Sequence, residues 1–188
     1  MKIQRRRSRN AWGFTMIEIL VVVIVVGLLA TIAAPAWQGF LNNQRLGTAQ
    51  NEVYLAIREA QSNARRTKER WFASFRTLPS GQSQFAVLRV PENLSVSGFT
   101  SNSCDSFPWR NLESSIRVSY VSSVPTLGAC ANDARYIGFD KDGNYTTGLL
   151  NAGVRIRSAN GGGRRCVVIT TILGSVRQLT EVDSGCPA

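Results

Sequence analysis

Residues 14–37 read FTMIEILVVVIVVGLLATIAAPAW, and this stretch decides how the rest of the chain can be arranged. Between Ile17 and Ala36 its single charged residue is Glu18. A helix of about twenty residues is about 30 Å long, which is the thickness of the hydrocarbon core of a bilayer. The stretch therefore predicts one membrane-spanning helix.

The segment before this stretch, MKIQRRRSRNAWG, is basic and polar. It holds five of the 22 lysines and arginines of the chain: Lys2, Arg5, Arg6, Arg7 and Arg9. The positive-inside rule places such a segment in the cytoplasm and everything after Trp37 on the other side of the membrane. Without residues 1–13 the net charge falls from +10 to 17 minus 12, or +5. Half of the basic excess therefore lies in a candidate targeting segment.

An ordinary secretory signal peptide is an alternative interpretation. Its cleavage site would follow the apolar run, where Ala30, Ala33 and Ala34 are small enough. Glu18 argues against this alternative, because a carboxylate in a spanning segment is costly and usually has a partner or a task. A simpler explanation for Glu18 is that it lies near the membrane surface and reaches water.

The run from Gly13 through Phe14 to Glu18, with the apolar stretch and Pro35 behind it, resembles the class III signal of type IV pilins and type II secretion pseudopilins. In that family a prepilin peptidase cleaves after the glycine, here Gly13. The new N-terminal residue, here Phe14, is then N-methylated. The glutamate, here Glu18, is proposed to pair with the freed amine of a neighbouring subunit during filament assembly.

The spacing of these residues agrees with the roles that the resemblance implies. Cleavage would create an amine four residues before Glu18, which is one helical turn away, so pairing within one chain is open as well. Pro35 and Gly39 stand where the helix would leave the membrane, and a proline there predicts a kink. A plain interfacial kink without a role is the alternative.

The helical pattern continues beyond Trp37 but becomes amphipathic. Apolar residues recur every three or four positions at Leu46, Ala49, Val53, Ile57, Ala60 and Ala64. This spacing predicts that the helix runs to about Phe75 with its second half packed on a domain. The predicted division of the chain has four segments: a cleaved leader (1–13), a transmembrane and polymerisation helix (14–36), its amphipathic continuation (37–78) and a β-rich head (79–188).

Alternating apolar residues and glycine-rich turns predict that the head is an antiparallel sheet. The predicted strands are residues 85–90, 116–121, 135–139, 154–158, 166–173 and 175–179. The predicted fold class is α+β, a long N-terminal helix packed on an antiparallel β-sheet head, as in pilins. Residues 136–148 and 166–179 are similar to the paired C-terminal elements of the GspH/FimT group of minor pilins and pseudopilins.

The four cysteines all follow the membrane stretch. None forms a CxxC pair, and an even number indicates disulfides in an oxidising compartment. Three pairings are open, as are four free thiols. Proximity in sequence favours Cys104–Cys130 and Cys166–Cys186.

The chain contains no histidine, which removes Ser–His and Cys–His nucleophile pairs. Residues 140–144 (DKDGN) resemble a calcium loop only superficially, because the glycine is fourth and position twelve is Asn151. A hairpin turn is the simpler interpretation. We therefore expect no metal, no cofactor and no enzymatic activity; an anchored periplasmic enzyme would need a catalytic cluster.

Arginines are numerous near the C-terminus. Two follow the glycine run 161–163, and the full group is Arg155, Arg157, Arg164, Arg165 and Arg177. Arginine is well suited to gripping phosphate. Some FimT-type minor pilins are DNA receptors, so the resemblance implies these residues as candidate DNA-binding residues. A solvated surface or contacts between subunits are the alternatives, and the basic run 65–70 is expected to be a solvated helix face.

The resemblance predicts a minor pilin or pseudopilin of a type II secretion or type IV pilus system. Its implied partners are other pilin or pseudopilin subunits, a prepilin peptidase and an inner-membrane assembly platform. The implied location is the bacterial inner membrane, crossed once, with the C-terminal head in the periplasm until assembly into a filament. The alternative function is a DNA-binding minor pilin for DNA uptake.

Overall fold

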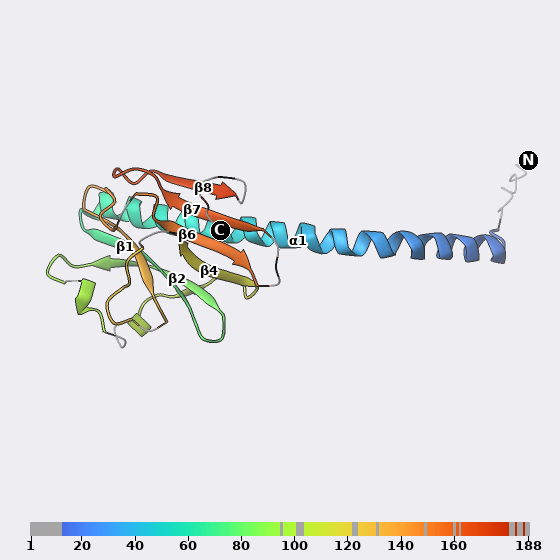
Figure 1. Ribbon diagram of the computed structural model, residues 1–188, viewed down its shortest axis with the longest axis horizontal. Helices are drawn as coiled ribbons and strands as arrows, with labels where there is room; N and C mark the ends of the chain where they lie inside the picture. Colours follow the sequence, from blue (N-terminus) through green and yellow to red (C-terminus); the bar gives the residue numbers. More distant parts are fainter. Residues whose placement is uncertain are drawn as a thin grey trace, which may run out of the picture. The chain divides into compact units, whose positions relative to one another are not determined.

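The computed structural model describes residues 13–94, 96–100, 104–121, 124–130, 132–148, 150–159, 161, 163–180, 183 and 186, with the backbone alone at 34–36. The chain divides into two units, Met1–Phe40 and Leu41–Ala188. We call the second the globular unit. Figure 1 shows its strands and the C-terminal part of the long helix together.

The long helix α1 runs from Met16 to Thr67. The prediction that it continues to about Phe75 is wrong. The apolar spacing ends at Ala64, and Lys68 adopts a positive φ of 57°, a left-handed conformation that ends helices. Strand β1 (Arg70–Thr77) begins two residues later. Its alternate side chains are buried on opposite faces, as in a strand that is covered on both sides.

Within the described residues, eight strands form two antiparallel four-stranded sheets. Sheet A has the order β3-β2-β1-β5, and sheet B has the order β4-β6-β7-β8. Besides β1, the strands are β2 (Ser83–Val90), β3 (Arg110–Asn111), β4 (Ile116–Val121), β5 (Arg135–Phe139), β6 (Gly153–Ser158), β7 (Arg164–Ile169) and β8 (Val176–Thr180).

The predicted α+β fold class is confirmed, and the predicted bounds of β4 and β5 are met at both ends. Other predicted strand ends are shifted by one or two residues, and three larger differences remain. β1 and β3 were not predicted, β7 ends at Ile169 rather than Leu173, and the strands divide between two sheets. β7 is shorter because residues 170–175 form the tight turn to β8, in which Gly174 has a φ of 76°.

The main core lies between the C-terminal part of α1 and one face of each sheet, which we call the inner faces. Leu46, Val53 and Ile57 of α1 are fully buried there with Phe75 of sheet A and Ile156 of sheet B. The helix contributes four alanines to the same cluster, and small side chains let backbones approach closely. One stripe of α1 therefore supports both sheets.

A buried glutamine fixes α1 to sheet B. The Gln50 Nε2 donates to the carbonyl oxygens of Cys166 and Leu179, each at 2.9 Å. Its Oε1 accepts from Nη1 of Arg165 at 3.3 Å. The side chain thus joins the helix to β7 and β8 at one point.

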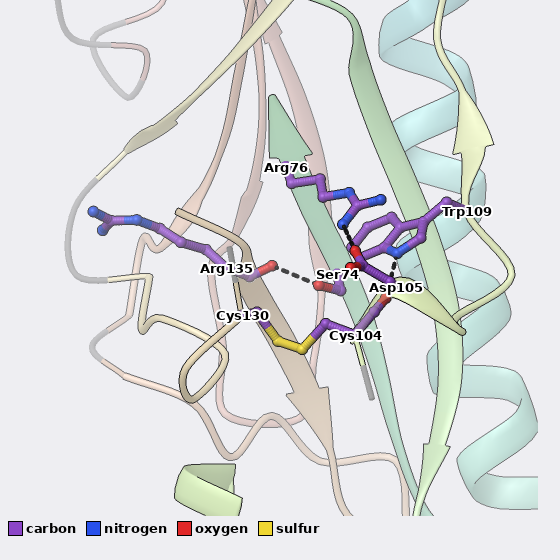
Figure 2. The surroundings of a disulfide bond; sticks show 7 residues. All are labelled: Ser74, Arg76, Cys104, Asp105, Trp109, Cys130 and Arg135. Carbon is purple, nitrogen blue, oxygen red and sulfur yellow. Dashed lines mark hydrogen bonds and ion pairs between the residues drawn. A yellow bond between two sulfur atoms is a disulfide. The ribbon is translucent and has the colours of Figure 1, made fainter. Parts of the chain in front are cut away.

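Each disulfide attaches a non-strand segment to an outer face, the face turned away from α1. Cys104–Cys130 lies in a second buried cluster with Phe72 and Leu88 of sheet A (Figure 2). Cys166–Cys186 joins β7 to the C-terminal segment over sheet B. The predicted pairing is confirmed.

Replacement of Gln50 by alanine should lower the free energy of unfolding by about 1–3 kcal/mol, because two buried carbonyls lose their donor. Urea unfolding of the full chain in detergent micelles measures the change. Gln44→Ala, on an exposed position of the same helix, is the matched control and should stay within about 0.5 kcal/mol. Equal effects of the two substitutions would contradict the role given to Gln50.

Candidate functional site

The N-terminus of α1 is built by Thr15 and Glu18. The Glu18 N–H donates to the Thr15 carbonyl at 3.1 Å and lies 3.3 Å from the Thr15 hydroxyl, so Thr15 caps the helix. Glu18 follows in the first turn, where a carboxylate complements the helix dipole. A Cβ at Gly13 would meet no atom within 4 Å, so packing does not require a glycine there.

The apolar side chains at the start of α1 are exposed on every side of the helix. From Met16 to Ile32 the least exposed large apolar residue is Val25, at 48%. A stretch of this helix has a mean hydropathy of 2.8, and by length and composition it could cross a membrane. An all-round apolar surface of this kind needs lipid or other apolar helices as its surroundings. α1 runs through Pro35 and Gly39. The side chain of Pro35 lies outside the described residues, and the predicted kink stays a prediction.

The structure separates the five C-terminal arginines onto two faces of sheet B. Arg155 and Arg157 alternate with the buried core residues Val154 and Ile156, which places them on the outer face. Arg164 stands opposite Arg157, and Arg177 stands opposite Val168 of the outer cluster. These four arginines therefore share the outer face.

Arg165 belongs to the opposite face. It stands opposite the core residue Ile156, and its guanidinium bonds Gln50 beside Gly47 of α1. The five residues are thus not one surface. The sequence analysis missed Arg117, which stands opposite Arg157 on β4. The alternating sequence of β4 predicted that Arg117 lies on a strand, but it did not predict that β6 is the neighbouring strand.

The two sheets differ in how their arginines are compensated. Their strands together contain eleven arginines and no Asp or Glu. Four on sheet A reach carboxylates of loops and of α1, at 2.8–3.2 Å: Arg76–Asp105, Arg89–Glu69, Arg110–Glu59 and Arg135–Asp133. Figure 2 shows the first of these pairs, with the Arg76 guanidinium also 4.1 Å from the ring centre of Trp109.

On sheet B, neither Arg155 nor Arg157 takes part in an ion pair within the described part of the chain. Burial lowers the pKa of the Arg155 guanidinium, and the charges of Arg157 and Arg164 lower it further. The three guanidinium groups are therefore close enough to repel one another. Such a face is suited to binding an anion.

In the turn at residues 140–144, backbone N–H groups of the turn itself bond the Asp140 carboxylate. Asp140 accepts from the backbone N–H groups of Asp142 and Asn144 at 2.9 and 2.8 Å. Burial raises its pKa, but these hydrogen bonds outweigh burial and the pKa lies below its usual value. Among the described residues, no group of three His, Cys, Asp or Glu side chains could hold a metal.

Comparison with known protein families identifies a motif near the N-terminus. A family pattern described as the prokaryotic N-terminal methylation motif matches residues 9–34. The N-terminal segment is a type IV pilin signal. The resemblance to the type IV pilin and pseudopilin superfamily is thereby confirmed.

A curated relative agrees with this signal. "Fimbrial protein EcpC" of Eikenella corrodens is 41% identical over 39 residues, which are 21% of this chain. The match covers 26% of that protein, so this chain spans about a quarter of its length. No solved structure matches the chain. Gly13, Phe14 and Glu18 all fall inside the pilin signal, and their individual roles stay predictions.

The register of sheet B predicts a measurable repulsion. Arg157→Gln should raise the free energy of unfolding by about 0.2–1 kcal/mol at low salt, because Arg157 lies between Arg117 and Arg164 across the strands. The gain should shrink in concentrated salt, which screens exposed charges. Arg177→Gln, opposite an apolar residue, is the control for urea unfolding. Destabilisation by Arg157→Gln, or a gain independent of salt, would contradict this interpretation.

Proposed function

We propose that this protein is a minor pilin or pseudopilin of the GspH/FimT kind, a filament subunit of a type IV pilus or type II secretion system. The observation that carries the proposal is the pilin signal on a helix whose apolar side chains are exposed all round. Such a helix can exchange lipid for the helices of other subunits without uncovering apolar surface to water. The protein then acts as a structural subunit rather than an enzyme.

The proposed sequence of events begins in the bacterial inner membrane, with the C-terminal head in the periplasm. A prepilin peptidase cleaves between Gly13 and Phe14, and the new amine of Phe14 is methylated. Because packing does not require glycine at position 13, recognition by the peptidase is a sufficient reason for it. An inner-membrane assembly platform then transfers the subunit into the filament.

In this proposal the Glu18 carboxylate sets the axial position of each subunit relative to its neighbour. In the cleaved chain Phe14 carries an amine, and Glu18 lies in the first turn of α1. A carboxylate in apolar surroundings needs an opposite charge. The amine of an adjacent subunit satisfies this need at one axial position only, so the pair sets the step between subunits.

Glu18→Gln should leave cleavage intact and reduce incorporation into filaments about tenfold or more, because the amine of the neighbouring subunit loses its counter-charge. The mass of the mature N-terminus reports cleavage, and the amount of the protein in purified filaments reports incorporation. Glu52→Gln, on the part of α1 in the globular unit, is the matched control. Normal incorporation of Glu18→Gln would contradict the role of this carboxylate.

A strain in which the gene is deleted, compared with its parent for surface pili and secreted protein, identifies the system to which the subunit belongs. Loss of surface pili with normal secretion would assign the subunit to a type IV pilus. Loss of secretion with intact pili would assign it to a type II secretion pseudopilus.

DNA uptake is the second candidate function, and the outer face of sheet B favours it. Arg155, Arg157, Arg164 and Arg177 share this face, and the described strands of sheet B carry no acidic residue. Arginines on one face neutralise phosphates without reading sequence. In this case the filament would present the subunit as a DNA receptor.

The double substitution Arg155→Gln and Arg157→Gln should weaken binding of duplex DNA about tenfold or more at low salt and reduce the salt slope by about 2. Fluorescence anisotropy of a labelled duplex, with the full chain in detergent micelles, measures both. Arg165→Gln is the matched control, because Arg165 faces α1. Equal loss in the control and the double variant would exclude the outer face as the DNA site.

A further inference from the structure

A polar hollow lies on the C-terminal part of α1, away from the outer face of sheet B. It has a volume of about 270 Å³ and is lined by Arg58, Gln61, Ser62 and Arg65. Positions 58, 62 and 65 are four and seven residues apart, so the two arginines flank the serine on one side of the helix. The space suits one side chain or small anion rather than a larger ligand.

Arg58 is held in place by uncharged groups. Its Nη1 donates to the Gln61 Oε1 at 2.9 Å, and its Nε donates to the Tyr54 hydroxyl at 3.3 Å. The guanidinium also lies 5.7 Å from the centre of the Tyr54 ring. These contacts fix the group and leave its charge without a carboxylate.

Gln61 is the rigid part of this arrangement. The two N–H groups of its buried amide Nε2 are shared among the carbonyl oxygens of Gly143, Leu173 and Gly174, which lie at 3.0–3.1 Å. Gly174 has a φ of 76°, and a Cβ there would meet that nitrogen and the Phe139 ring, so a glycine is favoured at this position. The hollow is thereby joined to the turn between β7 and β8.

Arg65 packs against Gly143, and the two carboxylates of the turn that holds Gly143 are already engaged. Asp140 accepts hydrogen bonds within its own turn, and Asp142 bonds Lys68 at 3.1 Å. Within the described residues, neither Arg58 nor Arg65 forms an ion pair. Two fixed or packed cations therefore face the hollow uncompensated.

The adjoining turn carries two exposed aliphatic side chains. Ile172 and Leu173 are each 66% exposed, although the backbone of the turn is fixed by Gln61 and by the Tyr145 N–H, which donates to the Ile172 carbonyl. An arginine pair beside aliphatic residues has the composition of a protein interface, in which arginine and apolar groups are enriched.

We propose that the hollow and the β7–β8 turn dock a partner protein through an acidic segment. A carboxylate of the partner lies between Arg58 and Arg65 near the Ser62 hydroxyl, and an aliphatic side chain of the partner covers Ile172 and Leu173. Charge complementarity selects an acidic partner. The exposed aliphatic pair selects a protein over a nucleic acid, which would leave these side chains uncovered. This inference does not depend on the kind of filament or on DNA binding.

Fluorescence anisotropy with labelled peptides tests the proposal on the full chain in detergent micelles. The probe is a peptide of sequence GLEELG, compared with GLQQLG and GSEESG. The acidic aliphatic peptide should bind about tenfold more tightly than either control peptide. Equal binding of GLEELG and GLQQLG, or no binding of any peptide at millimolar concentration, would falsify the proposal.

Variants locate the binding. Arg58→Gln with Arg65→Gln, and separately Ile172→Ser with Leu173→Ser, should each abolish the preference for GLEELG. Arg66→Gln, on the same helix but outside the hollow, is the matched control and should keep it. Thermal unfolding checks each fold. If the arginine pair instead changes the binding of a short DNA duplex and leaves peptide binding unchanged, the hollow is a nucleic-acid contact and the docking proposal is wrong.

Discussion

Contact between one stripe of α1 and the inner faces of two sheets is the constraint on which the globular unit depends. The stripe alternates larger aliphatic residues, such as Leu46 and Ile57, with alanines, so that strands from both sheets approach the same helix closely. Neither sheet could bury its inner face without it. The buried amides of Gln50 and Gln61 then fix the helix along its axis by bonding carbonyls of β7, β8 and the nearby turns.

The outer faces are completed by covalent bonds. A sheet packed on a helix through one face leaves its other face in need of cover. Cys104–Cys130 is buried against the outer face of sheet A, and Cys186 is buried against the outer face of sheet B through its bond to Cys166. The described residues thus form three buried clusters with α1 as the one long helix among them. Disulfides of this kind persist in oxidising compartments.

The ion pairs of the strand arginines are distributed unevenly between the two sheets. Sheet A surrounds its arginines with carboxylates from loops and from α1, which makes them part of the fold. Arg155 and Arg157 of sheet B, and the pair Arg58 and Arg65 of α1, form no ion pair within the described residues. These two arginine pairs and the exposed apolar start of α1 are the surfaces that we propose for contacts with other molecules.

The sequence alone determined what depends on local pattern: the membrane-length helix, the pilin signal and most of the strands. Each is encoded by neighbouring residues, so spacing is sufficient to find it. Proximity favoured one pairing of the cysteines, but only the tertiary structure decided among the three. The end of α1 at Thr67, the two-sheet division and the faces of the arginines were decided by tertiary structure. β1 follows a helical pattern without a Gly or Pro break, and only pairing with β2 and β5 makes it a strand. Arg164 and Arg165 are adjacent in the chain and lie on opposite faces of sheet B, because successive side chains of a strand alternate. Which of the two faces is inner depends on the side that α1 covers, and only the tertiary structure decides this.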